Sequence, residues 1–263
     1  TSPFAFTGNK FEFRAVSSNQ SVAYPAAFLN TIVAESMDYI CDQLEERGGA
    51  NAETINAVVR ETLASHRRIL FDGDNYSGDW VDEAERRGLL NRRTTPEALV
   101  ALSDEKNLEL FERFGVLSSH ELESRANVSN EIYASKIRVE ALATLDMGRT
   151  MILPAATAFQ RQLSDTIRGV RDIDASIDTE AQVGALRAAT AAASDLQGAI
   201  DRLVERLESV ESRDFGEAEH AQAMLDEVGP AMNAVREIAD RLEQMVDDDR
   251  WPLPKYRELM FVR

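Results

Sequence analysis

The sequence predicts a mainly α-helical protein with a short N-terminal β segment and a long antiparallel helical hairpin or bundle toward its C-terminus. The β segment is predicted because residues 10–16 alternate between polar and apolar in the period of two that is typical of a half-buried strand. The helices are predicted because apolar residues recur every three or four positions from residue 132 to residue 246. With 263 residues and 44% hydrophobic content, the chain is long and apolar enough to bury a substantial core.

The first half of the chain carries several local start and stop signals. Gly8 and Asn9 predict a turn before the strand, and Pro25 predicts the first turn of a helix that ends at glycines 48 and 49. Asn51 is expected to cap a second helix with Thr54 inside it. Shorter helices are predicted from about 80 to 88, after the cap at Thr94, and from about 104 to 115.

The second half predicts long helices. Pro154 must kink or split the helix expected over residues 132–173, since proline cannot donate a backbone hydrogen bond. Two heptad seams follow, over residues 186–210 and 221–246, and the short glycine-containing loop between them predicts an antiparallel hairpin bent near Pro230. Such seams form either the core of one bundle or a coiled coil between subunits, and both uses are compatible with the spacing. The expected domains are residues 1–126, a long-helix bundle at 127–250, and a rigid, extended tail at 251–263 with aromatic anchors.

Charge and cysteine content exclude several classes of function. The net charge is −17, of which −12 lies between residues 165 and 250, as expected for a solvated helical face. This acidity argues against nucleic acid and anionic membranes as partners, and no apolar run is long enough for a membrane span. Cys41 is the single cysteine, so we expect no internal disulfide, a reducing cytoplasmic setting and a small buried thiol.

The predicted strand places three charged residues on one face. Lys10, Glu12 and Arg14 alternate with Phe11 and Phe13, so the charged and aromatic side chains are expected on opposite faces. One interpretation is the wet face of an edge strand. The other is a polar cleft in which the carboxylate holds a metal ion and the cations hold an anionic substrate.

Several segments resemble the large type III class of glutamine synthetases. Residues 2–14 read SPFAFTGNKFEFR, and they are followed by SNQS at 18–21 and LNTIVAE at 29–35. The resemblance continues through ILFDGDNYS at 69–77, RGLLN at 87–91, TTP at 94–96 and WPLPKY at 251–256. It covers essentially the whole chain and is least specific in the helical hairpin. It implies that the N-terminal β segment comes from the glutamine synthetase catalytic barrel.

The resemblance also implies an activity and residue roles. The enzymes of this class make glutamine from glutamate, ammonia and ATP through γ-glutamyl phosphate. Glu12 would be a ligand of Mg²⁺ or Mn²⁺, Arg14 would contact the γ-carboxylate of glutamate, and Lys10 would contact the nucleotide phosphates. Relatives often carry arginine at the position of Lys10, so here the charge is kept and the bidentate fork is lost.

The family's other metal-ligating and substrate-binding residues have no counterpart in this sequence. We therefore expect a fragment of a longer polypeptide, catalytically silent alone. The alternative is a non-catalytic module for helical oligomerisation or interaction. The resemblance suggests a ring-type homo-oligomer, and we predict that the heptad surface mediates its self-association.

Overall fold

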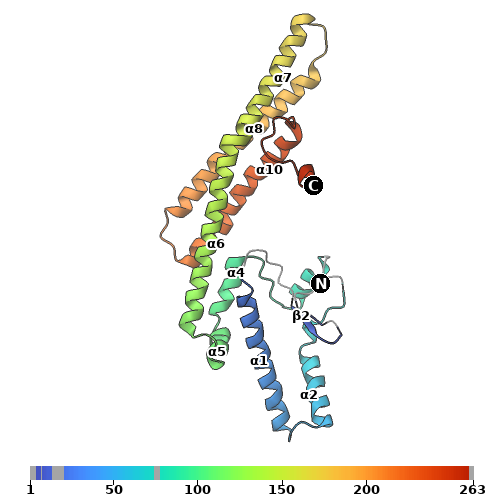
Figure 1. Ribbon diagram of the computed structural model, residues 1–263, viewed down its shortest axis with the longest axis vertical. Coiled ribbons are helices and arrows are strands. Elements are labelled where there is room, and N and C mark those ends of the chain that lie inside the picture. Colours follow the sequence, from blue (N-terminus) through green and yellow to red (C-terminus); the bar gives the residue numbers. More distant parts are fainter. Residues whose placement is uncertain (1–3, 7, 14–20, 74–77, 261–263) are drawn as a thin grey trace. The chain divides into compact units, whose positions relative to one another are not determined.

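The computed structural model describes residues 4–6, 8–13, 21–73 and 78–260 (Figure 1). The chain forms two compact units, Thr1–Arg125 and Ala126–Arg263. The first unit holds a β hairpin and short to medium helices, and the second holds long helices. Within the described ranges, no helix is both long enough and apolar enough to cross a membrane.

The predicted N-terminal strand is present and pairs with a second strand. Strand β1 (Phe4–Phe6) runs antiparallel to β2 (Phe11–Phe13), with Phe6 opposite Phe11. Gly8 lies in the predicted turn with a φ of 90°, a left-handed conformation that glycine adopts at little cost. The alternation predicts a strand from residue 10, but β2 begins at Phe11. Residues 14–20, including Arg14, lie outside the described residues.

Helices α1 (Ala23–Glu46) and α2 (Ala52–Ser65) form the next hairpin. The first helix ends as predicted, because Gly48 and Gly49 both adopt positive φ. Asn51 caps α2 through bonds to the backbone N–H groups of Glu53 and Thr54, both at 3.0 Å, which confirms the predicted cap. An ion pair of 2.7 Å between Arg47 Nη2 and Glu61 Oε2 joins the two helices.

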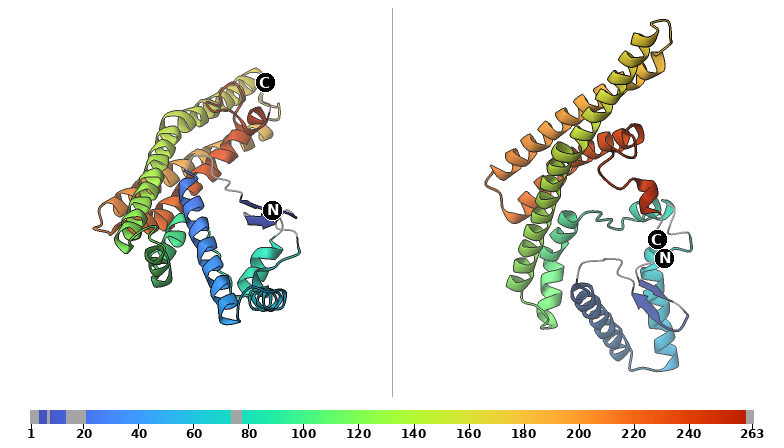
Figure 2. Two further views of the ribbon diagram at one scale, coloured as in Figure 1. Left: turned by 60° about the horizontal axis from the view of Figure 1, so that its bottom comes forward. Right: turned by 45° about the horizontal axis from the view of Figure 1, so that its top comes forward.

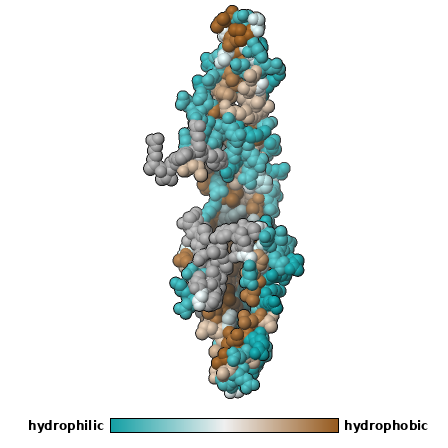
Figure 3. Space-filling view, turned by 90° about the vertical axis from the view of Figure 1, so that its right-hand side faces the viewer, coloured by the Kyte–Doolittle hydropathy of each residue, from teal (hydrophilic) through white to brown (hydrophobic). Residues whose placement is uncertain are grey.

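Both helices leave large apolar side chains exposed. The exposed residues on this α1–α2 face are Ile32, Val33, Met37, Ile40, Ile55, Val59 and Leu63. Figure 3 shows hydrophobic side chains among hydrophilic ones near the bottom of that view, where α1 and α2 lie. The expectation that Cys41 is buried is wrong, since its thiol is exposed on α1. The reason is that the apolar residues of α1 cover more of its circumference than its neighbours bury.

Short helices complete the first unit. They are η1 (Arg67–Ile69), α3 (Asp79–Arg86), α4 (Thr95–Val100), η2 (Ala101–Ser103) and α5 (Glu105–Arg113). Helix α4 begins with a capping box in which the Glu97 carboxylate accepts a bond from the backbone N–H of Thr94 at 3.3 Å. Helix α5 packs on α1, where the rings of Phe28 and Phe111 meet edge to face at 5.0 Å.

The helix expected around Pro154 continues through a π turn. Helix α6 (Ser119–Met147) passes into η3 (Gly148–Ile152) and then into α7 (Leu153–Ile173). Proline lacks a backbone N–H, and the wider hydrogen-bonding ring of a π turn accommodates the missing donor just before it. The same arrangement recurs before Pro230, where η4 (Met224–Val228) separates α9 (Glu217–Ala223) from α10 (Gly229–Met245).

The two heptad seams form the core of the second unit. Helix α8 (Glu180–Glu211) packs against both α7 and α10, and Figure 2 shows this arrangement from two sides. The predicted antiparallel hairpin is confirmed. The prediction that this heptad surface mediates self-association is wrong, because its residues are covered by other helices of the same chain: Leu196, Ile200, Leu203 and Val210 are all fully buried.

The C-terminal segment is anchored to the bundle. Trp251 joins the core of the second unit, as its aromatic character predicts. Lys255 Nζ donates to the carbonyl oxygen of Val246 at 2.9 Å and pairs with Asp248 at 2.6 Å. The segment is not extended throughout, because it contains a short helix, α11 (Tyr256–Leu259).

Candidate functional site

The charged face of β2 places a cation beside a carboxylate. Lys10 lies just before the strand and Glu12 lies within it, two residues apart and therefore on the same side of the backbone. Lys10 Nζ lies 3.9 Å from Glu12 Oε1. The Lys10 side chain is 73% exposed and that of Glu12 is 35% exposed, so Glu12 is the more enclosed of the two. Arg14, the third predicted site residue, lies outside the described residues.

The carboxylate of Glu12 fits the role of one metal ligand. Carboxylate oxygens are the ligands that Mg²⁺ and Mn²⁺ prefer, and Mg²⁺ is commonly held by one or two carboxylates together with substrate phosphates. Among the residues that the structure describes, no three His, Cys, Asp or Glu side chains gather closely enough to hold a metal ion. A metal site that included Glu12 would therefore need its other ligands from outside the described residues.

A second arrangement joins two of the recognised segments through Arg87. Its Nη1 donates to the carbonyl oxygens of Arg68 at 3.0 Å and Leu70 at 2.6 Å. Its Nε donates to the Glu83 carboxylate, and its guanidinium lies 5.6 Å from the ring centre of Trp80. The segment at 87–91 thus holds the start of the segment at 69–77 in place.

Aromatic packing and charge reinforce this arrangement. The centres of the Trp80 and Phe71 rings lie 4.6 Å apart, so the indole contacts both Phe71 and the arginine. Hydrogen bonds from Arg86, and then from Arg87, lower the pKa of the Glu83 carboxyl below its usual range. Sequence reasoning missed these contacts. The sequence offered one signal for them, because residues 69–77 and 87–91 both belong to the segments that resemble type III glutamine synthetases.

Comparisons with known proteins agree with the resemblance. Residues 54–171 match the family model of the glutamine synthetase C-terminal domain. The whole chain is 39% identical to the type-3 glutamine synthetase of Dictyostelium discoideum, of which it covers 36%. It is 32% identical to a glutamine synthetase of Bacteroides fragilis, again over the whole chain and 37% of the relative, and 29% identical to one from Butyrivibrio fibrisolvens.

These matches concern part of each relative's length. The chain spans little more than a third of the curated proteins that it matches. The family model that matches residues 54–171 is that of the C-terminal domain. The chain is therefore similar, over its whole length, to part of the type III glutamine synthetases, and residues 54–171 match the C-terminal domain of that enzyme family.

Proposed function

We propose that this chain acts as the C-terminal part of an ATP-dependent glutamine synthetase. The observation that carries the proposal is the 39% identity to a type-3 glutamine synthetase over the whole chain. In the proposed reaction, a γ-carboxylate oxygen of glutamate attacks the terminal phosphorus of ATP, and ADP leaves. Ammonia then attacks the γ-carbonyl carbon of the acyl phosphate, a proton is lost from nitrogen, and inorganic phosphate leaves as glutamine forms.

The roles proposed for the chain's own residues follow from their chemistry. Glu12 supplies a carboxylate oxygen to a divalent metal, Mg²⁺ or Mn²⁺, which neutralises phosphate charge when bound. Lys10 provides a positive charge for the nucleotide phosphates, and its exposure leaves it accessible to a ligand. Arg14 is proposed to contact the γ-carboxylate and to stabilise charge that develops during phosphoryl transfer.

We also propose that the 263-residue chain is catalytically silent by itself. One metal-ligating carboxylate is too few for the family's two-metal site. A γ-glutamyl transfer assay with Mn²⁺ tests this on the purified chain beside the full-length enzyme at equal molarity. We expect turnover by the full-length enzyme alone. Metal-dependent turnover by the 263-residue chain would contradict the proposal.

The alternative is a non-catalytic interaction module. The observation in its favour is the exposed α1–α2 face, which resembles a docking surface. The two functions differ at Glu12. A catalytic role predicts that Glu12→Gln in the full-length protein removes activity, and a purely structural role predicts that it does not. A cytoplasmic location and a ring-type homo-oligomer belong to the same proposal, and a reducing compartment suits the exposed thiol of Cys41.

A further inference from the structure

Helix α6 carries an apolar stripe on its solvent side. The α6 stripe consists of Val128, Ile132, Val139 and Leu142, whose side chains are 49%, 48%, 63% and 42% exposed. At 100° per residue, these four positions fall within an arc of about 80° on the helix surface. Four large apolar side chains therefore line one narrow strip of surface along four turns of the helix.

The same helix already buries a different face in the bundle. Its buried residues Asn130, Ala134, Ala141 and Leu145 lie about 135° around the helix from the stripe. Ala134, Ala141 and Leu145 belong to the core of the second unit. The stripe is thus additional to what the bundle requires, and it does not belong to the seams of α8 and α10.

The stripe has the heptad pattern of a two-stranded coiled coil. Spacings of four, three, four and three residues connect Val128, Ile132, Ser135, Val139 and Leu142. In this register Ile132 and Val139 occupy a positions, and Val128, Ser135 and Leu142 occupy d positions. In parallel coiled coils, β-branched residues at a with leucine at d favour two strands over larger assemblies. Asp146 occupies the next a position, so its charge ends the apolar stripe.

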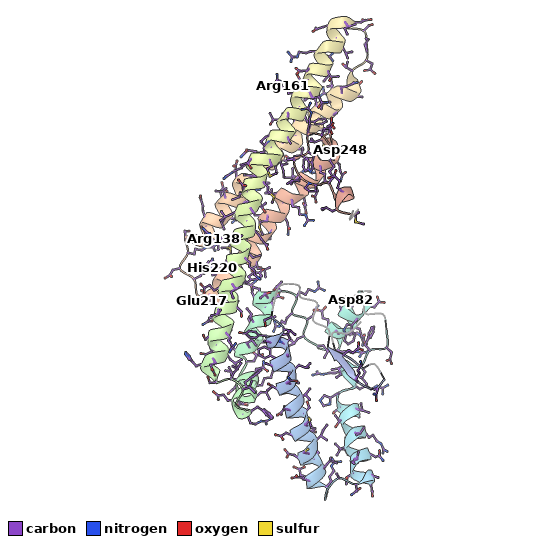
Figure 4. All side chains as sticks on the ribbon, viewed as in Figure 1. Asp82, Arg138, Arg161, Glu217, His220 and Asp248 are labelled. Carbon is purple, nitrogen blue, oxygen red and sulfur yellow. The ribbon has the colours of Figure 1, made fainter. Side chains whose placement is uncertain are left out.

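The charges beside the stripe are complementary to those beside the stripe of a second copy. Glu131 occupies a g position and Lys136 the e position five residues later, which are the positions that face each other across a parallel pair. Both are exposed, and neither makes an ion pair with another described residue of its own chain. Arg138, at the following g position and labelled in Figure 4, is bonded through Nε to Glu211 and would face the neutral Ala143.

We infer that the α6 stripe is a contact between two copies of this chain, with their α6 helices parallel about a two-fold axis. Each stripe residue then meets its own counterpart, and two Glu131–Lys136 pairs form across the axis. The bundle holds α6 folded before association, so two heptads suffice where a free peptide of that length would not be helical. The α1–α2 face is less suited to self-pairing, because the charged residues of α1 and α2 are mostly acidic.

The mass of the purified chain over a range of concentrations tests this inference by sedimentation equilibrium. We expect a concentration-dependent dimer that Ile132→Glu combined with Val139→Glu abolishes, with unchanged circular dichroism. Ile173→Glu is the matched control, since Ile173 is 84% exposed on α7 and lies away from the stripe. A wild-type chain that stays monomeric, or a folded double variant that still dimerises, would overturn the inference.

Two further variants keep the test decisive if the double variant fails to fold. Glu131→Lys should weaken the dimer several-fold, and adding Lys136→Glu should restore it. In a Cys41→Ser background, Ser135→Cys should form a disulfide between copies under mild oxidation, because equivalent d positions face each other in a parallel pair. Absence of both the charge rescue and the disulfide would refute the parallel arrangement.

Discussion

Gly148 lies directly against Ile200 where the π turn of η3 crosses α8. A Cβ atom built at position 148 would lie 3.0 Å from Cδ1 and 3.3 Å from Cγ1 of Ile200. Ile200 is fully buried, so it has little room to move. The absence of a side chain at position 148 thus permits the close approach of the two long helices.

Gly148→Ala is expected to lower the free energy of unfolding by about 1 kcal/mol, because overpacking outweighs the better helix propensity of alanine. Gly169→Ala on α7 is the matched control, since a Cβ there meets nothing within 4 Å. That variant should be more stable than wild type by about 0.5–1 kcal/mol. Urea unfolding followed by circular dichroism measures both changes. Equal effects of the two substitutions would refute the packing argument.

Adjacent valines on α2 offer a second matched comparison. Val58 is 3% exposed, and Val59 is 51% exposed. Val58→Ala should cost about 2 kcal/mol of stability through lost burial and a cavity, whereas Val59→Ala should change stability by less than about 0.5 kcal/mol. Thermal and urea unfolding of the 263-residue chain give the two values. A large cost at Val59 would show that the α1–α2 face is covered in solution.

Much of the first half of the chain could be predicted because its signals are local. The cap at Asn51 and the helix end at Gly48 depend on residues within one turn, so the sequence alone locates them. The contact of Arg87 with Leu70 joins residues 17 positions apart, and no local pattern specifies it.

The second half shows a different limit. Heptad spacing predicts the long helices, but the same spacing fits an internal core and a subunit interface. The structure assigns the seam containing Leu203 to the core and leaves the α6 stripe exposed. The predicted burial of Cys41 is wrong for a related reason. Periodicity identifies apolar positions on α1, but it does not say which of them other helices cover. The roles of Lys10, Glu12 and Arg14 stay predictions, because they come from the resemblance and depend on residues outside this chain.

Arg87 should be far more sensitive to substitution than its neighbour Arg86. Arg87→Lys removes the Nη1 group that donates to two carbonyl oxygens, and we expect a loss of about 2 kcal/mol from hydrogen bonds of about 1 kcal/mol each. Arg86→Lys should be nearly neutral, since that side chain is 74% exposed. Tryptophan fluorescence should also shift for Arg87→Lys, because the guanidinium lies over Trp80. Equal stability of the two variants would contradict this account.

The lowered pKa of Glu83 predicts a pH dependence of stability. The folded-state pKa lies below the ordinary value near 4.5, with the hydrogen bond from Arg86 as the largest cause. This contribution is therefore fully present above pH 4.5 and is lost as the pH falls through the folded-state pKa. Carboxyl chemical shifts during an acid titration should place the midpoint of Glu83 below its ordinary value near 4.5. Replacing Arg86 with glutamine should move the Glu83 midpoint upward. An unchanged midpoint would contradict the assigned cause.

We propose that β2 brings a metal ligand, Glu12, to a glutamine synthetase active site. The most direct test measures glutamine formation and metal dependence in the full-length enzyme carrying Glu12→Gln, with Glu45→Gln on α1 as the control. We expect Glu12→Gln to lower activity and weaken metal affinity by more than about 100-fold, with unchanged assembly and folding. We expect wild-type behaviour for the control. Near-normal activity and metal affinity in a folded Glu12→Gln enzyme would contradict the claim.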